Sequence, residues 1–200
     1  EFIHINAFLS KPISADELIR QVNKYLPKNN GTTIAKIKLG GIIQHTDLVR
    51  ISLTCPSIQA NGYGRLLAAL GEANINVQFL VQILRPDQVE LLVLCIDKEA
   101  QTRTLQIISM IRDSHHIHID SIHPDVTTIG VYGPDFRLRP GLAGALLAAL
   151  HTAGIPVQAI STSLSTFSVI IPSPKVEQAF SAIQQAFELH DEPVTTVFFI

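Results

Sequence analysis

The chain has few of the residues that mark several common protein classes. Its 200 residues include only two cysteines, Cys55 and Cys95, which is too few for a secreted disulfide scaffold. The formal net charge of −2 gives no electrostatic reason to expect nucleic acid as a partner. No apolar run approaches the roughly 20 residues of a membrane-spanning helix. We therefore expect a cytoplasmic protein with reduced thiols and without membrane or nucleic-acid contacts.

Catalytic motifs are also missing. The sequence contains no G-x-x-x-x-G-K-[ST], no G-x-S-x-G and no H-E-x-x-H. Residues 62–64 (GYG) form an isolated glycine pair without the dinucleotide-binding fingerprint. We therefore expect no enzyme activity, no catalytic residue and no cofactor.

What the sequence does contain is an internal repeat. Residues 66–70 (LLAAL) return unchanged at 146–150, and the alanine, isoleucine, valine and glutamine at 73, 75, 77 and 78 also return 80 residues later. A period of 80 residues is too long for a solenoid unit and suits two copies of one small domain. Clefts between two like domains are places where small ligands bind.

Both copies have the same predicted order of strands and helices. The first copy has strands at 48–54, 76–84, 89–96 and 117–122 and helices at 64–73 and 98–112, after a strand at 33–39 and a break at Gly40-Gly41. The second has strands at 126–132, 157–161, 167–171 and 194–200 and helices at 141–153 and 175–187. This order predicts an α+β fold of two ferredoxin-like βαββαβ units in tandem, each with an antiparallel sheet and both helices on one face.

The expected domain boundaries follow from the repeat. A first unit covers residues 41–120 and a second covers 121–200, and the last strand completes either the second unit or the first. Residues 1–30 form a separate N-terminal segment, where Ser14 and Glu17 are spaced as a capping box before a predicted amphipathic helix that ends at Pro27.

Four histidines gather where the two copies join. Alternation around His116 and His118 predicts a strand with both imidazoles on one face, and His115 and His123 lie nearby. Because no cysteine or acidic residue stands at zinc-site spacing, we expect solvent-facing histidines and no metal site.

The second copy resembles a known family. Residues 129–133 (IGVYG), 139–143 (RPGLA), 149–155 (ALHTAGI) and 160–163 (ISTS) resemble the second ACT domain of aspartokinase regulatory regions, and residues 41–51 resemble the start of the first. The resemblance covers about residues 41–200. It implies amino-acid-binding regulatory modules that occur in tandem, exchange strands and associate in pairs of chains, so a homodimer with a small-molecule effector is expected.

A second resemblance covers residues 4–26. The string AFLSKPI at 7–13 and the predicted helix after it look like the C-terminal strand and helix of a response-regulator receiver domain. The resemblance implies that Lys11 contacts a phosphorylated aspartate. The alternative is an ordinary capped helix that packs on the ACT pair.

The loop before the predicted helix at 141–153 is the candidate effector site. Free N–H groups and the positive end of the helix dipole suit an α-carboxylate, and an acidic side chain or a carbonyl would take the ammonium. The resemblance adds a hydroxyl-bearing strand end to the site. The candidate ligand-binding residues are Asp135, Phe136, Arg137, Leu138, Arg139, Pro140, Gly141, Ser161, Thr162 and Ser163. For both segments, the alternative is a turn with a purely structural role.

Two departures limit this interpretation. Leu164 stands where aspartokinases often carry an acidic residue, so recognition of a lysine side chain is in doubt. In the first copy, Asn61 aligns with Gly141, and residues 82–85 lack the hydroxyl groups of 161–163. Asparagine tolerates left-handed backbone geometry, so we expect the first copy to keep its turn and to have a structural or dimerising role.

The sequence therefore predicts a non-catalytic regulatory module that binds a small amino acid at an ACT–ACT interface and signals through dimer geometry. One alternative is an oligomerisation scaffold that has lost ligand binding. Another is the C-terminal regulatory part of an aspartokinase-like amino-acid kinase.

Overall fold

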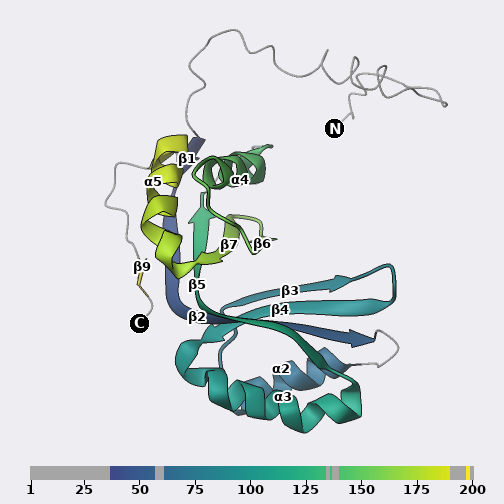
Figure 1. Ribbon diagram of the computed structural model, residues 1–200. Helices are drawn as coiled ribbons and strands as arrows, with labels where there is room; N and C mark the ends of the chain where they lie inside the picture. The colour runs from purple at the N-terminus through teal and green to yellow at the C-terminus, as the bar shows by residue number, and fades with distance from the viewer. Residues whose placement is uncertain (1–36, 57–60, 134–135, 137–139, 190–196, 199–200) are drawn as a thin grey trace, which may run out of the picture. The chain divides into compact units, whose positions relative to one another are not determined.

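The computed structural model (Figure 1) describes residues 37–56, 61–133, 136, 140–189 and 197–198. The chain divides into two compact units, Glu1–Ala35 and Lys36–Ile200. All described residues belong to the second unit, so the predicted N-terminal helix and Lys11 lie outside them. Its strands are β1 (Ile37–Leu39), β2 (Gly41–Pro56), β3 (Phe79–Leu84), β4 (Val89–Asp97), β5 (His118–Tyr132), β6 (Ala159–Thr162), β7 (Thr166–Pro172), β8 (Phe187–Leu189) and β9 (Val197–Phe198). Its helices are α2 (Gly62–Glu72), η1 (Lys98–Ala100), α3 (Gln101–His115), α4 (Leu142–Thr152), η3 (Ser173–Lys175) and α5 (Val176–Ala186).

Two long strands, β2 and β5, divide the main sheet into two lobes. The strand order is β3-β4-β2-β5-β7-β6, and β9 lies parallel to β2. In the first lobe, residues 48–56 of β2 pair with β4, and residues 118–123 of β5 lie on the other side. In the second lobe, residues 126–132 of β5 pair with β7, and residues 41–45 of β2 lie on the other side. Each lobe is thus an antiparallel four-stranded unit of the predicted ferredoxin-like type.

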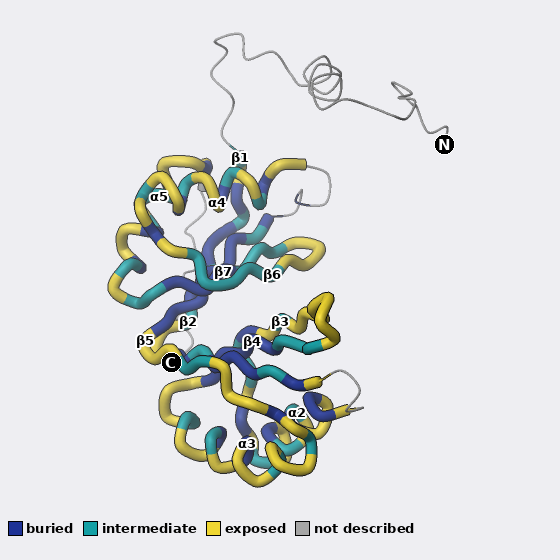
Figure 2. Tube along the Cα trace, turned by 45° about the vertical axis from the view of Figure 1, so that its right-hand side comes forward, coloured by how far each residue is buried: buried dark blue, intermediate teal, exposed yellow. Residues whose placement is uncertain are grey.

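Each lobe has its own apolar core between the sheet and its helices. Helices α2 and α3 cover one face of the first lobe, and α4 and α5 cover one face of the second (Figure 1). Apolar side chains alternate along β2 and β5 with the period of two that a half-covered sheet requires. Figure 2 shows buried residues along β2, β4 and β7, whereas β3, β6 and the outer faces of the helices are largely intermediate or exposed. A third cluster, with Leu48, Val126 and Ile170, lies on the sheet faces that the helices do not cover.

The internal repeat is visible in backbone geometry as well as in sequence. Asn61 and Gly141 precede α2 and α4 with φ of 75° and 91°, both left-handed. The amide of Ile75 donates to the carbonyl of Leu70 at 2.9 Å, and Ile155 donates to Leu150 at 3.0 Å. The prediction that asparagine at position 61 preserves the turn is therefore confirmed.

The structure keeps the predicted break at Gly40, which is a bend between β1 and β2, and corrects the predicted start of the second strand at 48. Strand β2 begins at Gly41 and continues without interruption for 16 residues. A Cβ atom on Gly41 would lie 2.6 Å from the hydroxyl oxygen of Tyr132, so the tyrosine side chain occupies the space that a side chain on Gly41 would need. Gly41 therefore serves a close cross-strand contact at the start of β2.

A second correction concerns the region where the copies join. The strands predicted at 117–122 and 126–132 form one continuous strand, β5. Helix α3 extends to His115, and His116 ends it in left-handed geometry with φ of 49°. His116 therefore does not share a strand face with His118, which is the first residue of β5. Phe187, predicted at the end of a helix, begins β8 instead.

No described helix has both the length and the apolar character that crossing a bilayer requires.

Candidate functional site

The start of helix α4 supplies the backbone part of the candidate site. Strand β5 ends at Tyr132, and α4 begins after Gly141. Gly141 is exposed and has no side chain, so no N-cap side chain competes for the first N–H groups of the helix. Its left-handed φ of 91° also favours glycine over any other residue. This helix end can therefore accept an anionic group such as a carboxylate.

The hairpin between β6 and β7 is tied to the beginning of the same loop. The amide of Gly133 donates to the carbonyl of Ser165 at 3.1 Å. Within the hairpin, the Ser163 hydroxyl oxygen accepts from the amide of Thr166 at 3.1 Å. The structure thus places the predicted strand end beside the predicted loop. Ser163 stabilises the turn with its hydroxyl group.

Ser161 and Thr162 point to opposite faces of the second-lobe sheet, because successive side chains of a strand alternate. Ser161 pairs in register with Ser168, which in turn pairs with Gly130. This row lies on the face away from α4 and α5. A Cβ atom on Gly130 would lie 3.4 Å from the Ser168 hydroxyl oxygen, so the glycine leaves that hydroxyl uncovered. Ser161 and Ser168 together offer two neighbouring hydroxyl groups on an open face.

Phe136 anchors the loop in the core. Its side chain is 7% exposed, and its ring centroid lies 5.4 Å from that of Phe167. The ring also occupies the space beside Gly133, where a Cβ atom would meet it. Pro140, like Gly141, is exposed. The other candidate residues of this loop lie outside the described residues: Asp135, Arg137, Leu138 and Arg139.

The first lobe fills the equivalent position with a side chain. Tyr63, in the first turn of α2, is 4% exposed, and its hydroxyl oxygen lies 2.9 Å from the carbonyl oxygens of both Leu53 and Glu90. Burial raises the pKa of Tyr63 above its ordinary value, with smaller contributions from nearby acidic groups. The residue 80 positions later is Ala143. The second lobe therefore has only a methyl group where the first has a phenol.

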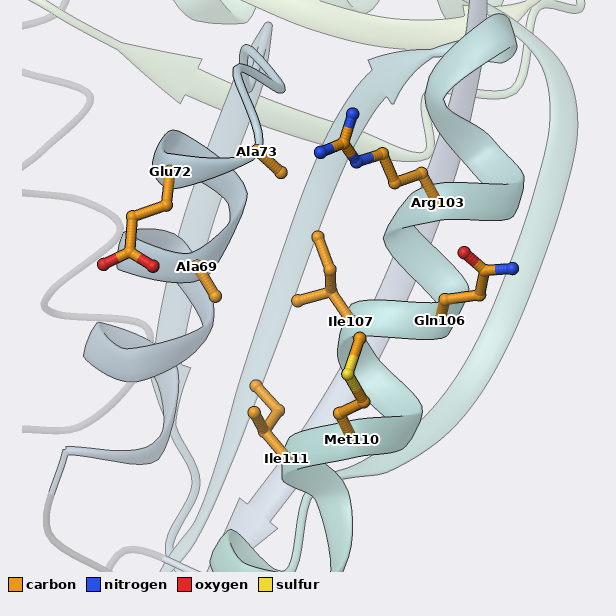
Figure 3. A pocket seen from close by; sticks show the side chains of 8 residues that line it. All are labelled: Ala69, Glu72, Ala73, Arg103, Gln106, Ile107, Met110 and Ile111. Atoms are coloured by element: carbon orange, nitrogen blue, oxygen red, sulfur yellow. The ribbon is translucent and has the colours of Figure 1, made fainter.

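Each lobe also carries a groove between its two helices. The groove between α2 and α3 has a volume of about 380 Å³ and is lined by Ala69, Ile107 and Met110 among others. Figure 3 shows Glu72 pointing away from it and Arg103 reaching toward α2. The equivalent groove between α4 and α5, about 480 Å³, is lined mainly by alanines. The lining of the α2–α3 groove includes both Arg103 and Glu72, whereas no charged side chain lines the α4–α5 groove, which therefore lacks partners for the carboxylate and ammonium groups of an amino acid.

The remaining reactive side chains do not assemble into a site. Both cysteines are free and buried, and burial raises the pKa of Cys95 to about 12 and raises the pKa of Cys55 as well. His116 and His118 are exposed. The described residues include no group of three or more histidine, cysteine or acidic side chains placed to hold a metal ion.

Sequence reasoning missed two features of this region. Nothing in the sequence singles out Tyr63, because residues 61, 62 and 65 also differ from their counterparts 141, 142 and 145 in the repeat. The pairing of Ser161 with Ser168 and Gly130 depends on the register of three strands, which no local pattern specifies.

Comparison with known proteins finds sequence similarity to ACT domains in the second lobe. A family model described as ACT domain matches residues 129–187. An aspartate kinase of Stutzerimonas stutzeri is 26% identical over 125 residues, which cover 62% of this chain and 30% of that protein. An aspartokinase of Thermus thermophilus is 32% identical over 68 residues, covering 34% of this chain and 17% of that protein. The chain therefore spans about a third or less of the curated relatives it matches.

Solved structures extend the likeness to both lobes. The ligand-free regulatory subunit of aspartate kinase from Thermus thermophilus matches with a TM-score of 0.68 and 23% identity, over 75% of this chain and 99% of that subunit. A structure of aspartokinase alpha and beta subunits matches with a TM-score of 0.65 and 25% identity, over 74% and 97%. The chain therefore contains an aspartokinase-like ACT region. The first of these matches is described as the regulatory subunit of an aspartate kinase.

Proposed function

We propose that this chain is a non-catalytic regulatory module that binds a small amino acid at an interface between ACT units of a homodimer. The observation that carries the proposal is the difference between the two lobes at the start of the first helix. Tyr63 fills this position in the first lobe, whereas the second lobe has only Ala143 there, after the uncapped Gly141. The second lobe is also the part that the ACT family model matches.

The chemistry of the start of α4 suits a zwitterion. The first N–H groups of α4 would bind the carboxylate, together with loop residues Arg137 to Gly141. The ammonium would bind Asp135, the Ser161 hydroxyl group and carbonyl groups of β6, which lies at the edge of the described sheet. Phe136 would hold the loop in place from the core side.

The effector side chain would be uncharged. Between positions 140 and 172 the sequence contains no aspartate, glutamate, lysine or arginine. Leu164, at the tip of the β6–β7 hairpin, is 71% exposed and would lie beside the effector. A lysine ammonium placed there would lose its hydration without gaining a counter-charge, which is costly.

The two hairpin tips support a homodimer. Leu84 and Leu164 occupy equivalent positions 80 residues apart, and their exposed fractions are 57% and 71%. Each leucine lies at the end of, or just beyond, a strand at an outer edge of the sheet. Large apolar side chains exposed on edge strands favour association, and a second chain would cover both tips.

Calorimetric titration with single amino acids tests the proposal. We expect saturable binding of an amino acid with an uncharged side chain, and about tenfold weaker binding after Ser161→Val, because a charge-assisted hydrogen bond is lost. Thr162→Val is the matched control on the opposite face of the same strand and should bind like the wild type. Absence of binding by any amino acid at millimolar concentration would contradict the proposal.

Two alternative functions, and one output for the proposed module itself, have specific support. The filled first-lobe position and the exposed leucines favour a scaffold that only assembles, and such a scaffold would dimerise without binding any amino acid. The aspartokinase matches favour the regulatory end of an amino-acid kinase, in which the effector would control phosphorylation of a carboxylate substrate. The receiver-like residues 4–26 instead favour coupling to a phosphorylation-responsive domain through Lys11. Assaying the full-length protein for kinase activity and for phosphorylation by acetyl phosphate separates these outputs.

A further inference from the structure

The strands that connect the two lobes carry a pair of opposed bulges. Between the pairs His45–Thr128 and Leu48–Val126, Thr46 and Asp47 of β2 lie opposite a single residue of β5, so β2 has one extra residue here. Between the pairs Leu48–Val126 and Arg50–His123, Pro124 and Asp125 of β5 lie opposite a single residue of β2, so here β5 has the extra residue. Bulges bend a strand and increase its local twist. Figure 1 shows β2 and β5 turning together where they pass from one lobe to the other.

The two bulges occupy corresponding places in the two lobes, although Asp47 and Asp125 lie 78 residues apart and not at the 80-residue offset of the sequence repeat. Asp47 and Asp125 each stand directly before the first strand of a lobe, and their φ angles are 55° and 56°. A left-handed conformation is uncommon for residues other than glycine, and aspartate is among those that tolerate it. The symmetric pair of strained residues marks the point where each lobe begins.

One cation lies between these two carboxylates. The Lys98 ammonium is 2.6 Å from a carboxylate oxygen of Asp125. The hydrogen bond and the charge of Asp125 raise the pKa of Lys98, and the charge of Asp47 adds to the effect. Lys98 begins the 3-10 turn η1 of the first lobe, so this contact links the first lobe to the strand start of the second.

The equivalent position in the second lobe has no such charge. Ser173 begins η3, and its hydroxyl lies 2.9 Å from that of Thr127 on β5. The apolar cluster around Leu48 and Val126 lies at the same level. Apolar contacts are non-directional and tolerate small rotations, whereas an ion pair with a fixed partner does not. Among the described residues, Lys98–Asp125 is the only ion pair at this junction. It is therefore placed to restrict the rotation of one lobe relative to the other.

We propose that the paired bulges are a joint between the two lobes and that Lys98 is its latch. While Lys98 binds Asp125, the joint is held in one arrangement. When the pair is broken, β2 and β5 remain continuous, but the lobes rotate about the apolar cluster. A conformational change in the second lobe, whichever effector causes it, can then change the orientation of the first lobe through the joint.

Distance measurements between spin labels test the latch in the full chain. Cysteines introduced at Glu72 and Thr152, which are exposed and equivalent in the repeat, report on the two lobes. The native thiols are buried and are expected to remain unlabelled. We expect Lys98→Met to broaden the distance distribution. We also expect amide exchange in residues 44–50 and 122–128 to increase about two- to fivefold, as for loss of an exposed ion pair.

Two controls make the test decisive. Lys175→Met removes a positive charge from η3 that contacts Gln178 and no carboxylate of the junction, and should leave both measurements unchanged. Asp125→Asn keeps a side chain that tolerates the left-handed backbone and should reproduce Lys98→Met. In 1 M salt, where screening acts within about 3 Å, the wild type should approach the variant. The proposal is overturned if Lys98→Met matches the wild type or if Lys175→Met broadens the distribution equally.

Discussion

Replacing Tyr63 by phenylalanine tests whether the buried Tyr63 hydroxyl group stabilises the first lobe. The hydroxyl has one hydrogen and lies 2.9 Å from two carbonyl oxygens, those of Leu53 and Glu90. Phenylalanine keeps the ring and its packing but removes the donor from a site that is almost fully buried. We expect a loss of about 1–2 kcal/mol in the free energy of unfolding, because buried carbonyl groups lose a partner.

The assay is urea unfolding at neutral pH, supported by thermal melting. For a chain of this size, each kcal/mol corresponds to a fall of about 2–4 °C in Tm. Tyr132→Phe is the matched control, because the Tyr132 hydroxyl makes no hydrogen bond to a described residue, and it should change stability by less than about 0.5 kcal/mol. The reasoning is refuted if Tyr63→Phe is as stable as the wild type, or if Tyr132→Phe loses as much.

Three further predictions concern stability and assembly. Because burial raises the pKa of Cys95 to about 12, the native state keeps a proton that the unfolded chain loses above about pH 9, and the free energy of unfolding should fall as the pH rises from 9 to 12. The urea midpoint of Cys95→Ala should fall less over this range than that of the wild type. An equal fall in both proteins would contradict the prediction. Leu70→Ala should cost about 2–5 kcal/mol in urea unfolding, because Leu70 is fully buried, and a loss below 1 kcal/mol would indicate a different core. Leu84→Asp with Leu164→Asp should shift sedimentation of the full chain from dimer to monomer without unfolding it, and an unchanged dimer would place the interface elsewhere.

The repeat made the local structure of each lobe predictable. Both helix starts, the apolar alternation along the strands and the left-handed residue at position 61 follow from patterns within about twenty residues. The burial of residues 92–96 of β4 agrees with their continuous apolar run, which is typical of a strand covered on both faces.

Features that depend on distant partners were not predictable from sequence. Gly40-Gly41 has the composition of a turn, and Gly40 does separate β1 from β2, but the contact with the distant Tyr132 side chain that accompanies the start of β2 at Gly41 has no local signal. Asp47 and Asp125 carry no local signal of a bulge, because their conformation is set by the register between β2 and β5. The blocking of the first lobe by Tyr63 depends likewise on carbonyl groups that two separate strands contribute.

The central claim is that the second lobe binds an amino acid and the first does not. The direct measurement is calorimetric titration of the full chain with amino acids that carry uncharged, acidic or basic side chains. The account predicts saturable binding of one uncharged amino acid per chain, which Ser161→Val weakens and Tyr63→Phe leaves intact. Preference for lysine would contradict the specificity, and the absence of saturable binding by every amino acid would contradict the claim itself.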